Sequence, residues 1–165
     1  MTAKEQQENI IKTYLKPILK ENGFKTNGNN WWKDKGNFYT VINLQNFSFN
    51  SKDNVDFCFN IGIALEKFVA DKTYKKITGF DIAIPLREQS FLPKNRETHK
   101  FRTNLGFQIT DTTNIDKFLI EFKIDFEEHI LPLLDNFDSI EKCIDFYDKI
   151  PLWKDTFRKL SERNI

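Results

Sequence analysis

The sequence predicts an α+β protein. We expect an antiparallel sheet of about four to five strands, with an N-terminal helix and C-terminal helices packed mainly on one face. Three observations lead to this prediction. Residues 5–21 carry apolar side chains at helical spacing, two β-prone runs flank the polar stretch 50–54, and helical spacing returns after residue 111. A chain of 165 residues is also long enough to bury one sizeable core, so we expect a single domain over residues 1–165.

The first helix is predicted over residues 5–21. Its apolar residues fall on one stripe: Ile10, Ile11, Tyr14, Leu15, Ile18 and Leu19. Pro17 lies inside this pattern, and we expect a kink there because proline removes one helical hydrogen bond. Gly23 follows as a C-terminal cap, since the backbone turns left-handed at such a position and glycine does so at little cost.

The middle of the chain is rich in strand signals. In the short strand "NWWKDK", Trp31 and Trp32 are adjacent and must point to opposite faces, so one of them covers a second surface or meets a partner. The other expected segments are a hairpin of strands 38–49 and 55–65, an ambiguous link at 66–78, a strand at 79–87 and a fifth strand at 99–109. Pro85 places the 79–87 strand at an edge or a bulge, because proline cannot donate to a ladder.

The rest of the chain reads as helix. A 3.6-residue period runs through Ile115, Phe118, Leu119, Phe122, Phe126 and Ile130. Pro132 is expected to end or bend this helix. Asp138 and Glu141 have the spacing of a capping box that opens another helix. Pro151 then stops that helix and begins a last one.

The two strands of the predicted hairpin have contrasting faces. In the second strand the large apolar residues alternate with small and polar ones, and we expect the large set to pack against the helices. The amides Asn43, Gln45 and Asn60 then share the opposite face with Gly62 and Ala64, whose small side chains leave room above them. Two interpretations stay open: the amides bond to each other under a covering loop, or they face a groove that awaits a partner.

The order of several short motifs resembles the bacterial family called domain of unknown function 4304. The resemblance lies in Pro17, Gly23-Phe24, Gly28-Asn29, Ile42 to Gln45 and Asn60 to Gly62. It covers the first 65 residues well and the C-terminal helices only in general pattern. Members often place a basic residue and a serine soon after the glutamine, and Asn46-Phe47-Ser48 departs from that. The resemblance implies an α+β fold and no established activity.

Charge and composition exclude some classes of protein. The net charge is only +1, which argues against a general nucleic-acid binder. The 17 phenylalanines are expected mainly in the core, and Cys58 and Cys143 are expected as buried thiols. No stretch approaches the length of an apolar membrane span, and the first ten residues hold no apolar run, so we expect a cytoplasmic protein with no membrane partner.

Signals of catalysis are weak. Asp125 and His129 lie four residues apart on a predicted helix and can reach one metal ion, but a solvated helix face explains them as well. His99 is a candidate general base without a recognisable nucleophile near it in the sequence. Glycine is scarce, and no phosphate-binding loop is present. We therefore expect no metal site, no catalytic residue and no cofactor.

A basic stretch between residues 87 and 102 is the second candidate site. Its candidate anion-binding residues are Lys94, Arg96, Lys100 and Arg102, with Phe91 and Phe101 interleaved. A solvated loop with two apolar anchors explains the same pattern. If the loop does bind, the chain is an enzyme acting on an anionic substrate through His99, or a nucleic-acid-binding module.

The leading hypothesis is a small binding or interaction module. Its candidate ligand-binding residues are Asn43, Gln45, Asn60 and Arg87, on the amide-lined face of the sheet. Neutral amides offer both donors and acceptors, so they suit an unknown protein, a peptide or a polar small molecule. A toxin-neutralising, immunity-type protein is one version of this hypothesis.

Overall fold

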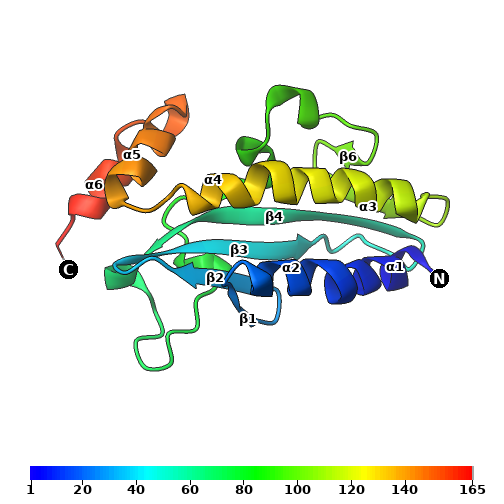
Figure 1. Ribbon diagram of the computed structural model, residues 1–165, viewed down its shortest axis with the longest axis horizontal. Helices are drawn as coiled ribbons and strands as arrows, with labels where there is room; N and C mark the ends of the chain where they lie inside the picture. Colours follow the sequence, from blue (N-terminus) through cyan, green and yellow to red (C-terminus); the bar gives the residue numbers. More distant parts are fainter. Residues whose placement is uncertain (165) are drawn as a thin grey trace.

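A seven-stranded antiparallel sheet organises residues 1–164, the part of the chain that the computed structural model describes (Figure 1). The strands are β1 (Lys25–Asn27), β2 (Asn30–Asp34), β3 (Phe38–Asn46), β4 (Asn54–Leu65), β5 (Leu86–Arg87), β6 (Arg102–Thr103) and β7 (Gly106–Thr110). Their order is β1-β2-β3-β4-β7-β6, and β5 pairs with β4. The predicted α+β class is confirmed, with more strands than the four to five expected.

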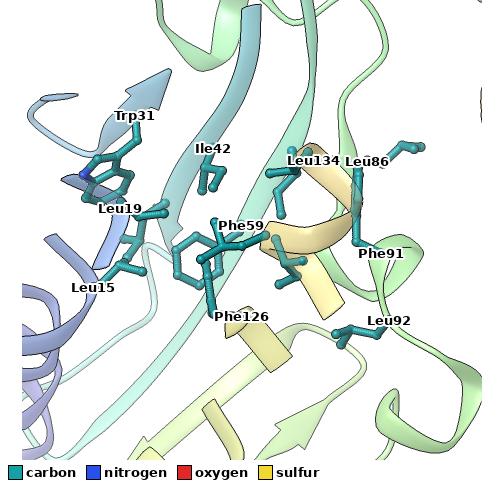
Figure 2. Packing of buried hydrophobic residues seen from close by; sticks show 14 of the residues in the cluster. Leu15, Leu19, Trp31, Ile42, Phe59, Leu86, Phe91, Leu92, Phe126 and Leu134 are labelled. Carbon is teal, nitrogen blue, oxygen red and sulfur yellow. The ribbon is translucent and has the colours of Figure 1, made fainter. Parts of the chain in front are cut away.

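The central hairpin of β3 and β4 sets both faces of the sheet. The two strands pair from Phe38 opposite Leu65 to Asn46 opposite Phe57. Alternation along β4 buries its large side chains in the main core, where Phe59 points from the sheet toward Phe126 (Figure 2). The expected hairpin and the expected core face are both confirmed.

Phenylalanines form the centre of this core. Phe59 and Phe107 from the sheet meet Phe122 and Phe126 from the covering helix, with ring centroids 4.8–6.2 Å apart. Many of these pairs meet edge to face, which is favourable because the positive ring edge approaches the negative ring face. Packing of aromatic side chains thus joins sheet and helix, as expected from the composition.

Two long helical rods cover the core face, lying along β3 and β4 (Figure 1). The first consists of α1 (Ala3–Ile10), η1 (Ile11–Leu15) and α2 (Lys16–Glu21), and the second of α3 (Ile115–Lys123), η6 (Ile124–Ile130) and α4 (Leu131–Asp135). Both η1 and η6 are π-helical, and each is followed within two residues by a proline, Pro17 or Pro132. The wider π turn lets the rod continue past a residue that cannot donate, so Pro132 does not end the helix.

The C-terminal elements close one end of the sheet. They are α5 (Ile140–Asp148), the 3₁₀ turn η7 (Pro151–Trp153) and α6 (Thr156–Glu162). The capping box expected at Asp138 and Glu141 is wrong by one residue. Ser139 is the N-cap of α5. Its backbone is extended, as at a typical N-cap, and its hydroxyl accepts the Lys142 amide. The carboxylate of Asp138 forms an ion pair with the Lys142 ammonium instead.

A small second core covers part of the opposite face. Trp32, Tyr39 and Val41 of the sheet pack under Val69, Ile77 and Ile82 of the connection between β4 and β5. Trp31 lies in the main core, so the two tryptophans divide between the faces as predicted.

The expected room above Gly62 is absent. A Cβ there would stand 2.5 Å from Ile82 Cγ2 and 2.9 Å from the Ile84 carbonyl oxygen, so Gly62 is required by the chain's own covering segment. The predicted strand 79–87 is also mostly wrong. Residues 79–81 form a 3₁₀ turn, and only Leu86 and Arg87 pair with β4. Pro85 directly precedes this short edge pairing, where no donor is needed.

The predicted strand 99–109 is a hairpin rather than one strand. β6 and β7 pair tightly across a turn that ends at Gly106, whose φ is +133°. A Cβ on Gly106 would also lie 2.4 Å from the Phe57 carbonyl oxygen. Glycine is therefore needed both for the backbone angle and for the close approach to β4.

Tyr147 ties the C-terminal helices to the rest of the chain. Its ring stacks on Phe157 at 4.7 Å, and its hydroxyl donates to the Ile84 carbonyl at 3.1 Å.

Among residues 1–164, no helix combines the length and the apolar character needed to cross a bilayer.

The assignment of the core face can be tested at Phe59. Phe59→Asp should abolish folding, because it buries an unpaired charge beneath the helical rods. Ile120→Asp is the matched control: Ile120 is 57% exposed, and its replacement should change the free energy of unfolding by less than about 0.5 kcal/mol. Thermal melts monitored by circular dichroism give the comparison. A Phe59→Asp variant that melts like the parent would show that the faces are misassigned.

The single-domain prediction can be tested by truncation. Deleting residues 111–165 removes Phe118, Phe122 and Phe126, and exposes the aromatic face of the sheet. The remaining chain should be insoluble, because a large apolar sheet face would stand open to water. A soluble fragment of residues 1–110 that unfolds cooperatively would contradict the prediction.

Candidate functional site

Four polar side chains stand in register across four neighbouring strands. Asn30 of β2 is opposite Asn43 of β3, Asn43 is opposite Asn60 of β4, and Asn60 is opposite Arg87 of β5. We call these residues, with Gln45 of β3, the amide row. The alternation of side chains along each strand puts all of them on the face away from the helical rods. The candidate residues Asn43, Gln45, Asn60 and Arg87 are thus brought together, and the sequence reading missed Asn30.

Hydrogen bonds link the members of the amide row. Asn43 Nδ2 donates to Asn30 Oδ1 at 2.8 Å, and Asn60 Nδ2 donates to Asn43 Oδ1 and Gln45 Oε1, both at 3.0 Å. Arg87 Nη1 donates to the same Gln45 Oε1 at 3.2 Å. These hydrogen bonds hold the side chains of the row in fixed orientations relative to one another.

The four amides of the amide row, Asn30, Asn43, Gln45 and Asn60, form the floor of an open groove of about 700 Å³. The lining residues are Asn30, Asn43, Leu44, Gln45, Asn46, Asn60, Thr78, Gly79, Phe80 and Pro85. The four amides of the row are half-buried rather than covered. Both interpretations of the amides thus hold in part, because they bond to each other and also face a groove.

Gly79 fixes the wall of the groove against its floor. Its backbone N–H donates to Asn30 Oδ1 at 2.9 Å, and a Cβ at this position would come within 2.9 Å of Asn43 Cγ. The backbone at Gly79 therefore rests directly on the amides of Asn30 and Asn43. Phe80 follows on the rim with its side chain fully exposed.

Two polar atoms of the amide row are not bonded to other described residues. Asn60 Oδ1 and Gln45 Nε2 have no hydrogen-bond partner within residues 1–164, while the other polar atom of each side chain is bonded. Neither atom is among the buried polar atoms that lack a partner, so both reach solvent. One is an acceptor and the other a donor.

Arg87 lies just beyond the end of the groove. Its guanidinium contacts Cys58 Sγ and stands 5.8 Å from the centre of the Phe47 ring, which in turn stacks on Phe49 at 5.4 Å. Arg87 makes no ion pair with any acidic residue of the described chain. Its positive charge is therefore held in place by a neutral amide and an aromatic ring.

The basic loop does not present its four candidate residues together. Arg96 binds Glu121 at 2.7 Å and Asp125 at 2.9 Å. Arg102 is buried against Glu88, while Lys94 and Lys100 are exposed. Two of the four cations are thus already neutralised by the protein's own carboxylates.

Asp125 pairs with His99 and Arg96, and it makes no hydrogen bond or ion pair with His129 within residues 1–164. Asp125 is fully buried on η6, and its second oxygen contacts His99 Nε2 at 2.8 Å. His99 Nδ1 accepts the Phe101 amide at 3.4 Å, so both ring nitrogens face the protein. Within residues 1–164 no group of three or more histidine, cysteine, aspartate or glutamate side chains is placed to hold a metal ion.

Glu88 fills a gap in the hydrogen bonding of β4. Its Oε2 accepts the Phe59 amide at 2.8 Å, and its Oε1 accepts Arg102 Nη1 at 3.0 Å. Burial raises the pKa of Glu88, while the Arg102 guanidinium and the Phe59 amide oppose that shift. This pair anchors the loop that follows β5.

The two cysteines are buried and unpaired, as predicted. Burial raises the pKa of Cys58 to about 11 and that of Cys143 to about 12. Both thiols are therefore almost entirely protonated at neutral pH, which makes them poor nucleophiles.

The structural role of the Glu88–Arg102 pair can be tested. Glu88→Gln should lower the free energy of unfolding by about 3–5 kcal/mol, because it leaves the buried guanidinium of Arg102 without a counter-charge. The double variant Glu88→Gln/Arg102→Met should recover part of the loss. Asp138→Asn is the control, since it breaks an exposed pair worth under about 1 kcal/mol. Urea unfolding measures all three, and equal losses for Glu88→Gln and Asp138→Asn would contradict this role.

Comparisons with known proteins identify a family without an assigned activity. No curated protein and no solved structure matches the chain. The model of a family described as a domain of unknown function, DUF4304, matches residues 15–136, which include the amide row, the groove and the basic loop. The match covers most of the chain and confirms the resemblance seen in the strand motifs, so the chain belongs to the DUF4304 family.

Proposed function

We propose that this protein is a binding module, and that its ligand is a peptide or a polar small molecule seated on the amide row. The observation that carries the proposal is the pair of free polar atoms, Asn60 Oδ1 and Gln45 Nε2, on the floor of an open groove. An aligned acceptor and donor complement a ligand that carries both kinds of group.

The chemistry of the groove favours recognition over catalysis. Asparagine and glutamine side chains neither titrate at ordinary pH nor act as nucleophiles, so they cannot serve as general acids or bases. The lining residues include no charged or nucleophilic group apart from the Thr78 hydroxyl. Preorganised neutral amides instead discriminate between ligands by hydrogen-bond geometry.

Exposed aromatic rings add to this interpretation. Phe80 is fully exposed on the groove rim, and Phe49, 59% exposed, belongs to the stack beside Arg87. Large exposed apolar side chains beside a concave polar surface are typical of interaction sites. The amides would set specificity, and the rings would supply apolar contact area.

The proposal can be tested by nuclear magnetic resonance with a library of small neutral amides and heterocycles. Binding fragments should shift the side-chain NH₂ signals of Gln45 and Asn60 in the ¹⁵N-labelled full chain. Asn60→Ala should remove these shifts, and Asn9→Ala should preserve them because Asn9 is exposed on α1, outside the groove. Fragments that bind elsewhere, or not at all, would contradict the proposal.

The same experiment needs a measure of stability. Asn43→Ala, Gln45→Ala and Asn60→Ala should each cost less than about 1 kcal/mol, because water in the open groove can replace the lost partner. If all three variants lose more than that without ligand, the amides are scaffold rather than a binding surface.

A further inference from the structure

We propose that the ligand is an extended peptide segment that crosses the strands, with a carboxylate at Arg87 and an apolar side chain against Phe80. This inference rests on the proposed function, because it names the chemical class of the occupant. Four features of the described residues carry it: the length of the amide row, its free donor and acceptor, its single unpaired cation and its exposed aromatic rim.

The length of the row suits a short stretch of extended chain. Neighbouring strands in a sheet lie about 4.8 Å apart, so three spacings from Asn30 to Arg87 span roughly 14 Å. An extended chain advances about 3.3 Å per residue, so about four residues cover the row. Gly79 bonds to Asn30, which places Phe80 at the end of the row opposite Arg87.

The free atoms of the row match the backbone of one residue in an extended chain. Each residue other than proline carries one N–H donor and one C=O acceptor, and in an extended strand both point to the same side. Asn60 Oδ1 can accept the donor, and Gln45 Nε2 can donate to the acceptor. Because these two side chains are already bonded to each other, their free atoms keep a fixed relative position. A ligand that offers only donors or only acceptors would leave one of them unpaired.

The charge of the site selects one anionic group. Arg87 carries the single charge of the amide row, and it has no acidic partner within residues 1–164. The residues that line the groove carry no charge. One carboxylate balances this arrangement, whereas a nucleic acid strand brings several phosphates and would need several cations. Contact with Gln45 and Phe47 holds the guanidinium at the end of the row.

Phe80 supplies the apolar end of the site. Its ring is fully exposed at the rim of the groove. The backbone beneath Phe80 is fixed, since the adjacent Gly79 rests on Asn30 and Asn43. A ring held on a fixed backbone can act as an anchor contact for a partner's side chain at little entropy cost.

The test uses the full chain and a positional-scanning library of acetylated, amidated hexapeptides, with binding measured by fluorescence polarisation. Enriched peptides should carry an aspartate or glutamate about three residues from an apolar residue. Arg87→Met should weaken these peptides about tenfold, and replacing the peptide's acid by its amide should weaken binding to the parent but not to Arg87→Met. Phe80→Ala should remove the preference for the apolar residue.

Matched controls separate the site from general effects. Lys94→Met removes one exposed positive charge outside the groove, and Tyr74→Ala removes a 78% exposed ring that does not line it. Both variants should bind the enriched peptides like the parent. Equal loss in Lys94→Met and Arg87→Met would overturn the charge argument, because binding would then follow net charge alone.

The outcomes distinguish this inference from the proposed function. If small fragments shift Gln45 and Asn60 but no peptide is enriched, the groove binds ligands and the peptide assignment is wrong. If neither fragments nor peptides bind, both proposals fail. A single-stranded tetranucleotide that binds the groove more tightly than every hexapeptide would also overturn the inference.

Discussion

The pairing of β3 with β4 is the constraint on which the rest of the structure depends. Because side chains alternate along a strand, one register assigns every residue of both strands to a face. A shift by one residue would place Phe57, Phe59 and Ile61 on the groove side and Asn60 in the aromatic core. The core and the amide row are therefore two results of the same pairing, and neither can change its position alone.

The parts of the fold that follow from periodicity were predictable. The hairpin, its core face, both helical rods and the separation of Trp31 from Trp32 all depend on regular spacing in the sequence. The errors fall where local signals compete with tertiary contacts. Residues 79–87 read as a strand because apolar residues alternate there, yet Ile82 and Ile84 are used to cover Gly62. The turn before Gly106 divides the predicted strand 99–109. Glycine is required there because the backbone approaches β4 closely, and a local sequence pattern contains no information about that contact.

The candidate site was predictable only within the sheet. Asn43, Gln45 and Asn60 were recognised because strand alternation puts them on one face, and Arg87 because it follows on the next segment. Asn30 was missed since its register opposite Asn43 depends on where β2 begins. The exposure of Phe80 was missed as well, because a phenylalanine in an alternating run is ordinarily buried. In the basic loop, the ion-pair partners of Arg96 lie on a helix 25 or more residues away in sequence. A local sequence pattern therefore could not predict that Arg96 is neutralised.

The carboxylate of Glu88 has a consequence for how the protein behaves among its own copies. β4 is long and rich in aromatic residues, and an open edge on such a strand would be a template for aggregation. Along that edge, the first residues of β4 pair with β7, and the next free amide, that of Phe59, donates to Glu88. Further along, β4 pairs with β5, and the Ile63 carbonyl accepts the Ala83 amide. One charged side chain thus bridges the interval between two short strands, and it protects the most apolar strand of the sheet from joining another molecule.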